Sequence, residues 1–64
     1  MTNLKRIRKE KGFTQSRLAV ALGVNQTTLS RYESGALDIN KAEAIVVYNM
    51  SRALGCAIED ILEV

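Results

Sequence analysis

The stretch LAVALGVNQTTLSRYESG, residues 18–35, decides the fold. Its first part is apolar at helical spacing and ends at Gly23, and a second helical segment begins two residues later with hydroxyl and amide side chains along one side. Two short helices joined this closely must cross at a steep angle. If the first packs on a core, the second can therefore present its polar side outward.

The rest of the chain predicts an all-α fold of one domain, residues 1–64. Each of the four glycines follows a segment of helical periodicity, where the left-handed conformation that ends a helix favours glycine. These breaks predict five helices, at about residues 3–11, 15–22, 26–34, 41–54 and 58–63.

Capping residues place the starts of these helices. Thr14 and Asn25 precede the second and third helices, and Asn40 with Glu43 three residues on has the spacing of a capping box for the fourth. The fifth helix has Ala57 at its capping position, so we expect it to fray. The inward positions predict a core of Leu4, Ile7, Phe13, Leu18, Ala21, Leu22, Val24, Thr28, Leu29, Tyr32, Val47, Met50, Ser51, Leu54, Cys56, Ile58, Ile61 and Leu62, with Ala19 beside them.

Composition narrows the function. The 64 residues include one cysteine and no histidine, which excludes an internal disulfide and removes the commonest metal ligand and catalytic base. We therefore expect no cofactor, no metal and no enzymatic activity. The sequence has no apolar run of membrane-spanning length and no signal-peptide pattern, so we expect no membrane association and a cytoplasmic location.

Charge is unevenly distributed along the chain. Residues 1–31 carry seven Lys and Arg and one Glu, whereas residues 32–64 carry two Lys and Arg and six Asp and Glu. The first half is therefore net +6 and the second net −4, which favours binding of a polyanion in one orientation. Solvation of the first helix is the alternative interpretation.

Residues 15–34 meet the requirements of a helix-turn-helix. Ala19 is small where the two helices cross, Gly23 forms the turn, and apolar side chains on both helices face the core. The alternative is an ordinary helical hairpin in a small bundle. The polar outer side of residues 26–34 favours the first interpretation.

Two segments carry a resemblance to a known family: LKRIRKEKGFTQSRLAVALGVNQTTLSRYESG at residues 4–35 and ALGCAIEDIL at residues 53–62. They resemble the Cro and phage-repressor type of helix-turn-helix protein, also called the xenobiotic-response-element family. The resemblance implies a five-helix lambda-repressor-like domain, a recognition helix at residues 26–34 and a DNA-binding transcriptional regulator, expected to be a repressor. The chain departs from many relatives between Gly35 and Gly55, where it is about three residues longer, as in small stand-alone regulators.

The resemblance also implies roles for individual residues. Base contacts in the DNA major groove fall on Gln26, Thr27, Ser30 and Arg31. A solvent or intrahelical partner is the alternative for Arg31, and other roles of a small hydroxyl are the alternative for Thr27 and Ser30. Gln15 corresponds to a residue that contacts a phosphate and braces Gln26, and Arg8 and Glu33 correspond to an internal ion pair. Further phosphate contacts, with capping or solvation as the alternative, are Arg17, Asn25, Thr28 and Ser34.

The fourth helix has a second apolar stripe, on the side away from the expected core: Ala42, Ile45, Val46, Asn49 and Ala53. Operators of such proteins are commonly pseudo-palindromic and require a two-fold dimer. We expect the first four of these residues, or the neighbouring turn between the fourth and fifth helices and the C-terminus, to form a homodimer contact on double-stranded DNA. The alternative is that the fifth helix folds back over the stripe. A protein-interaction module such as an antitoxin component is the alternative function, although a toxin-binding tail would add sequence.

Overall fold

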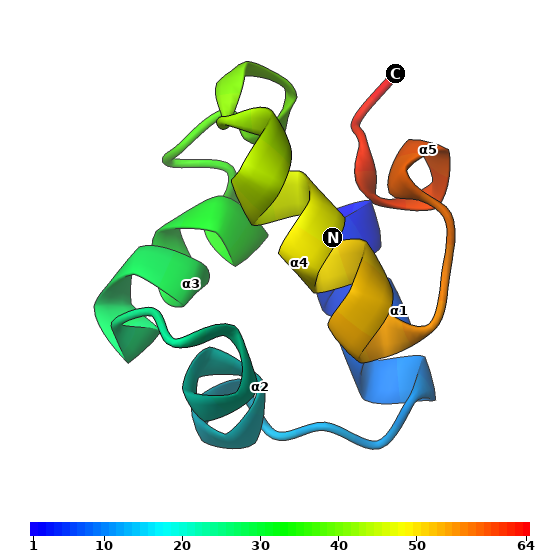
Figure 1. The fold of residues 1–64 in the computed structure, drawn as a ribbon. Helices are drawn as coiled ribbons and strands as arrows, with labels where there is room; N and C mark the ends of the chain where they lie inside the picture. The colour runs from blue at the N-terminus through cyan, green and yellow to red at the C-terminus, as the bar shows by residue number, and fades with distance from the viewer.

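The computed structural model describes residues 1–64 and is all-helical, as predicted. Figure 1 shows α2 and α3 on one side of the molecule and α1, α4 and α5 on the other. The helices are α1 (Asn3–Glu10), α2 (Gln15–Leu22), α3 (Gln26–Ser34), α4 (Ala44–Leu54) and α5 (Ile58–Ile61), with a 3₁₀ turn, η1 (Ile39–Lys41), before α4. None of them is long and apolar enough to cross a bilayer.

The core gathers one or more apolar side chains from every helix and from η1. Its fully enclosed members are Leu4, Leu18, Leu29, Met50 and Ile61, and Ile7, Ala19, Ile39, Val47 and Leu54 complete it. Half-buried side chains pack around them, among them Phe13, Leu22, Val24, Tyr32, Cys56 and Leu62.

Two predicted core positions are wrong. Ala21 is exposed and Ala19 is buried instead, because α2 packs against both α3 and α4 and its buried stripe is rotated toward Ala19. Ile58 is 37% exposed, and only the later residues of its segment reach the core.

The turn between α2 and α3 has the geometry of a left-handed helix end. Gly23 has φ 68°, and the N–H of Val24 donates to the carbonyl of Ala19 at 3.1 Å, which closes the last turn of α2. Asn25 then caps α3 by accepting from the N–H of Thr27 at 2.8 Å. The chain thus changes direction within the three residues between α2 and α3.

The predicted cap of the fourth helix is wrong. Asn40 lies in η1, and α4 begins at Ala44 after Glu43, which makes no capping bond. The Asn40 side chain instead pairs with the backbone of Glu63, donating to its carbonyl at 2.7 Å and accepting from its N–H at 2.9 Å. Because both bonds of the Asn40 amide go to this distant backbone segment, the side chain cannot cap the start of α4.

The fifth helix is shorter than predicted and ends at Ile61. Leu62 is extended, and its carbonyl accepts from the Asn3 side chain at 2.8 Å. These bonds and those of Asn40 hold the last residues against α1 and η1. The start of α5 is supported from within, because the Asp60 carboxylate accepts from the Ala57 N–H at 3.1 Å.

Candidate nucleic-acid interface

The outward face of α3 is entirely polar. On the inner side Leu29 is fully buried and Glu33 is 3% exposed. Thr28 and Tyr32 are half-buried, and Tyr32 packs against the core. The exposed residues are Gln26, Thr27, Ser30, Arg31 and Ser34.

A buried ion pair supports this helix from behind. Arg8 of α1 donates to Glu33 through Nε at 2.7 Å to Oε2 and through Nη2 at 3.1 Å to Oε1. Its remaining nitrogen, Nη1, donates to the carbonyl of Phe13 at 2.8 Å. The Arg8 and Glu33 side chains are 9% and 2% exposed, so the pair joins α1 to the end of α3 through well-satisfied charges.

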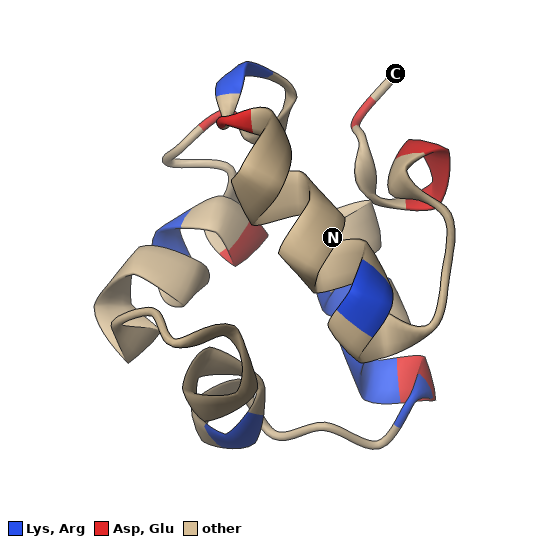
Figure 2. Cartoon of the chain, viewed as in Figure 1, with Lys and Arg blue, Asp and Glu red and all other residues tan.

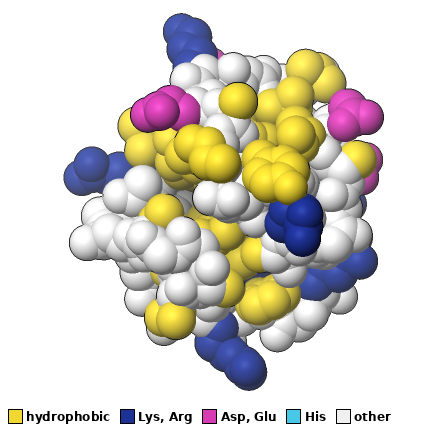
Figure 3. Space-filling model, viewed as in Figure 1, with side chains coloured by type: hydrophobic (Ala, Val, Ile, Leu, Met, Phe, Trp, Pro, Cys, Tyr) yellow, Lys and Arg dark blue, Asp and Glu magenta, His cyan; other side chains and the backbone are white.

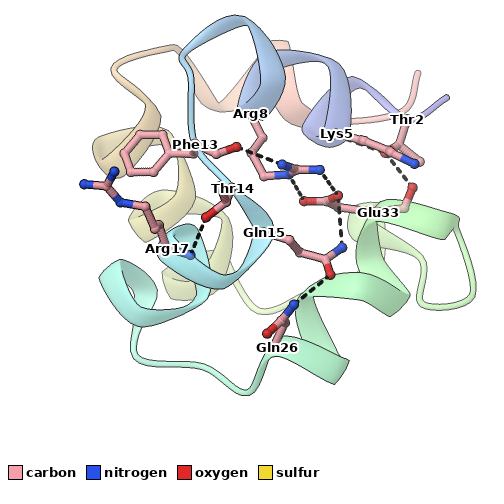
Figure 4. A network of polar contacts seen from close by, with 9 residues as sticks. All are labelled: Thr2, Lys5, Arg8, Phe13, Thr14, Gln15, Arg17, Gln26 and Glu33. Carbon is pink, nitrogen blue, oxygen red and sulfur yellow. Dashed lines mark hydrogen bonds and ion pairs between the residues drawn. The ribbon is translucent and has the colours of Figure 1, made fainter.

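Two glutamines extend this network to the surface (Figure 4). Gln15, the first residue of α2, donates through Nε2 to Glu33 Oε1 at 3.3 Å. Gln26, the first residue of α3, donates through Nε2 to Gln15 Oε1 at 3.3 Å. A continuous chain of hydrogen bonds therefore runs from the buried carboxylate to the exposed end of α3.

The two glutamines also line a shallow open hollow on the surface. Its other lining residues are Thr27 and Ser30, and no apolar side chain takes part. Three of the four residues predicted to contact bases thus lie together with the residue predicted to brace them. Arg31 lies on the same exposed face of α3 but outside this hollow.

Two arginines of the helix-turn-helix have no partner within the chain. Arg31 on α3 and Arg17 on the first turn of α2 are both exposed, and neither guanidinium has a hydrogen bond or ion pair within the chain. Figure 2 shows acidic residues on α5, before α4, near the C-terminus and at the end of α1, with only Glu33, which is paired with Arg8, on α3. The surface around α2 and α3 is therefore positive on balance.

The other predicted phosphate contacts are partly engaged within the chain. The Asn25 side-chain oxygen caps α3 and leaves the Nδ2 group without a partner. Ser34 donates to the Arg31 carbonyl at 3.2 Å and accepts from the Ala36 N–H at 3.3 Å. Thr28 is half-buried and has no side-chain hydrogen bond.

The α4 helix has an exposed apolar face, part of which was not predicted. Ile45 is 58% exposed, and Asn49 is exposed on the same side, so α5 does not cover them. Tyr48 is 44% exposed. The guanidinium of Arg52 lies 5.8 Å from its ring centroid and donates to its hydroxyl at 2.9 Å. The helical spacing of residues 45, 48 and 52 could have identified this face.

The predicted stripe on α4 is thus divided. Ala42, Val46 and Ala53 are half-buried and pack against the core, whereas the face described above points to solvent. Figure 3 shows apolar side chains gathered over this part of the molecule. We use the term α4 face for Ile45, Tyr48, Asn49 and Arg52.

The chain has no group of three His, Cys, Asp or Glu residues placed to hold a metal ion. Its one thiol, Cys56, is half-buried at the turn between α4 and α5. Burial raises the pKa of the Cys56 thiol, and the nearby Asp60 raises it further while Lys11 opposes the shift. A raised pKa reduces the thiolate fraction and makes this thiol less reactive.

Comparisons with known proteins agree with this geometry. A family model described as helix-turn-helix matches residues 4–61, which includes all of α2, α3, α4 and α5 and nearly all of α1. No curated protein gives a significant match. The chain belongs to the Cro and phage-repressor type of the helix-turn-helix family, a family of DNA-binding regulators.

Proposed function

We propose that the protein is a sequence-specific regulator that places α3 in the major groove of double-stranded DNA. The observation that carries this proposal is the exposed face of α3, which presents hydrogen-bonding side chains only and is held from behind by Leu29 and Glu33. A major groove admits one α-helix, and base edges there offer donors and acceptors in a distinct pattern for each base pair.

Each side chain on this face has suitable chemistry. Gln26 can pair with N6 and N7 of adenine, and the unpaired Arg31 guanidinium can pair with O6 and N7 of guanine. Thr27 and Ser30 can donate, accept or contact a thymine methyl group. A good bidentate pair contributes about 1–3 kcal/mol of discrimination.

Phosphate contacts would set the register. Gln15 and Arg17 occupy the first turn of α2, where backbone N–H groups without intrahelical partners favour an anion. Asn25 keeps its Nδ2 group for a second phosphate, and Thr28 and Ser34 lie at the flanks of α3. Such contacts position the protein without selecting a sequence.

The α4 face supports a homodimer on a pseudo-palindromic operator. A two-fold dimer on such a site places its recognition helices about 34 Å apart. One protomer measures 25 × 23 × 22 Å, so two protomers in contact can reach this spacing when each α3 lies off centre, as in Figure 1. A second copy would cover Ile45 and Tyr48, which would account for the exposed apolar side chains on α4.

Repression is the mode of regulation that a small DNA-binding domain supplies most directly. A protein seated in the major groove over a promoter excludes polymerase without needing a further activity. The second candidate function is a protein-interaction module such as an antitoxin component, and the same α4 face is the observation that favours it. In that case Ile45 would contact a different protein, and mixing experiments would show a heteromeric complex.

Selection of bound sequences from a random duplex pool tests the proposal. We expect an enriched site with two-fold symmetry, specific affinity in the range of about 10⁻⁸–10⁻¹¹ M, and binding that weakens steeply with salt. Gln26→Ala and Arg31→Ala should each lose preference at a different position of the site. An unselective pool for the wild-type protein would contradict the proposal.

A further inference from the structure

We propose that α4 pairs in antiparallel order with α4 of a second copy of this chain, and that Glu43 and Arg52 select this arrangement by forming two reciprocal ion pairs between the copies. This inference rests on the proposed function, because it specifies how the two protomers of the homodimer recognise each other. It gives the α4 face one occupant and gives Glu43 a role in assembly.

Opposite charges lie at the two ends of α4. Glu43 directly precedes the helix, is exposed, and makes no capping bond and no ion pair within the chain. Arg52 is exposed in the last turn. Figure 2 shows acidic residues just before α4 and a basic residue toward its other end. Asp38 and Lys41, in the segment before Glu43, carry opposite charges that offset each other. The helix therefore has a negative start and a positive end.

The Arg52 guanidinium is held on the α4 face and keeps free donors. Its Nη1 donates to the Tyr48 hydroxyl at 2.9 Å, and the guanidinium lies 5.8 Å from the ring centroid. Its Nε and Nη2 have no partner within the chain. An arginine can bind a carboxylate through two parallel N–H bonds. The Glu43 carboxylate of a second copy offers such an acceptor.

Two-fold symmetry leaves two ways to pair α4 with its copy side by side. In a parallel pair each residue lies beside the same residue of the second copy, so Glu43 would meet Glu43 and Arg52 would meet Arg52, and such like-charge contacts are repulsive. In an antiparallel pair each Glu43 meets an Arg52. The positive N-terminal end of each helix dipole then also lies beside the negative C-terminal end of the other. The charges therefore favour the antiparallel pair.

The antiparallel pair also places the apolar residues at the centre of the contact. Glu43 and Arg52 are nine residues apart, which is about 14 Å along a helix, and Tyr48 lies next to the midpoint. The two Tyr48 rings therefore lie beside the two-fold axis, with Ile45 of each copy within one turn of them and an ion pair at either end. An apolar centre with a polar rim is the usual anatomy of a protein interface.

Charge reversal at either end of α4 tests the arrangement. Glu43→Arg turns both ion pairs into contacts between two cations, and Arg52→Glu turns them into contacts between two anions. We expect each single variant to raise the Kd of the dimer by about tenfold or more, because two attractive contacts become repulsive. In a parallel pair each variant would replace one like-charge contact by another and leave the Kd unchanged. Sedimentation velocity over a range of concentrations measures the Kd without DNA.

The two reversals combined in one chain should restore the dimer. In the combined variant the introduced arginine of each copy faces the introduced glutamate of the other, so both ion pairs return with exchanged partners. Its net charge equals that of the wild type, which separates an effect of the ion pairs from an effect of overall charge. We expect its Kd to be close to the wild-type value.

Lys9→Glu is the matched control for Arg52→Glu. Lys9 is exposed on α1 and has no ion pair within the chain, so this variant makes the same change of charge away from α4 and should leave the Kd unchanged. Thermal unfolding shows whether each variant is folded. Glu43→Gln and Arg52→Gln remove a charge without reversing it. They should weaken the dimer by a smaller factor, and they keep the test decisive if a reversed variant does not fold.

Weaker dimers for both single reversals, with recovery in the combined variant, support the inference. A wild-type dimer that the single reversals leave unchanged, or that the combination does not restore, would overturn it and leave the proposed function standing. A wild-type chain that stays monomeric at every concentration and on its operator would also overturn it, and would indicate a different protein as the partner of the α4 face. An absence of sequence preference in DNA binding would instead overturn the proposed function, and the Kd values in solution would still decide the inference.

Discussion

Two helices of the molecule turn one side to solvent, and the two sides differ in composition. The face of α3 presents amides, hydroxyls and a guanidinium, and no apolar side chain. The α4 face presents Ile45 at 58% and Tyr48 at 44% exposure. Both helices pack their inner sides against the same core. The difference therefore lies in the kind of partner that the exposed side chains of each helix can bind.

The two faces are also supported differently. Behind α3 a network of hydrogen bonds runs from Arg8 through Glu33 and Gln15 to Gln26, and directional bonds of this kind fix the orientation of polar groups. On α4 the supporting contact is local, because the Arg52 guanidinium donates to the hydroxyl of Tyr48, one turn earlier on the same helix. A surface that selects among hydrogen-bonding partners needs polar groups held in fixed orientations. A surface that excludes water from a protein contact needs instead a sufficient apolar area and a shape that fits its partner.

The largest effect is expected from removal of the support behind α3. Glu33→Ala leaves the Arg8 charge buried and unpaired, and breaking one side of a buried pair costs about 3–5 kcal/mol. This is a large share of the stability of a small domain. Chemical denaturation measures the free energy of unfolding. The matched control is Glu10→Ala, because the Glu10 side chain is 59% exposed and pairs with Arg6 at 3.4 Å. Comparable losses in the two variants would contradict this role of the buried pair.

A change on the α4 face should act on assembly instead. Ile45→Glu places a charge in the proposed contact between two copies and should abolish the dimer while the monomer stays folded. Loss of the second half-site should weaken operator binding on the order of a hundredfold. Sedimentation velocity reports the dimer, and Val20→Glu, a change at a residue 79% exposed on α2, is the control. An Ile45→Glu protein that sediments like the wild type would exclude this face as the dimer contact.

Truncation on the α3 face should change selectivity with little effect on folding. Gln26→Ala and Arg31→Ala should each reduce discrimination at one base pair by about 1–3 kcal/mol. Both residues are exposed, so the melting temperature should stay near that of the wild type. Affinity measured against a set of single-pair operator variants gives the discrimination at each position. A uniform loss across all sequences would identify the residue as a phosphate contact rather than a base contact.

The helix boundaries and the exposed polar face of α3 could be predicted from the sequence, because they depend on local periodicity. The 3.6-residue repeat places Thr28, Leu29 and Tyr32 on the inner side of the helix, and the structure has Leu29 buried and the other two half-buried. The inward position of Glu33 came from the family resemblance. The helix boundaries near Thr14, Gly23 and Asn25 follow from groups that bond within a few residues. The position of the exposed polar face therefore needs no tertiary information.

Features that depend on distant partners were not predictable in this way. Asn40 with Glu43 has the local pattern of a cap, but the partner of Asn40 is the backbone of Glu63, 23 residues away. The buried side of α2 depends on its contacts with both α3 and α4, which placed Ala19 rather than Ala21 inside. Tyr48 and Arg52 are four residues apart on one helix, so their pairing could have been predicted from the sequence. The predicted apolar stripe on this helix did not include either residue.

The smallest effect is expected from a single proposed phosphate contact on α2. Arg17 is exposed on the first turn of α2, and its guanidinium has no partner within the chain. Arg17→Ala should weaken binding to all sequences about equally and reduce the slope of log affinity against log salt by about one. Lys41→Ala removes the same charge from η1, before α4 (Figure 2), and should leave the slope unchanged. Equal slopes for the two variants would mean that Arg17 contributes only to net charge, since a bound phosphate releases a counterion and a distant one does not.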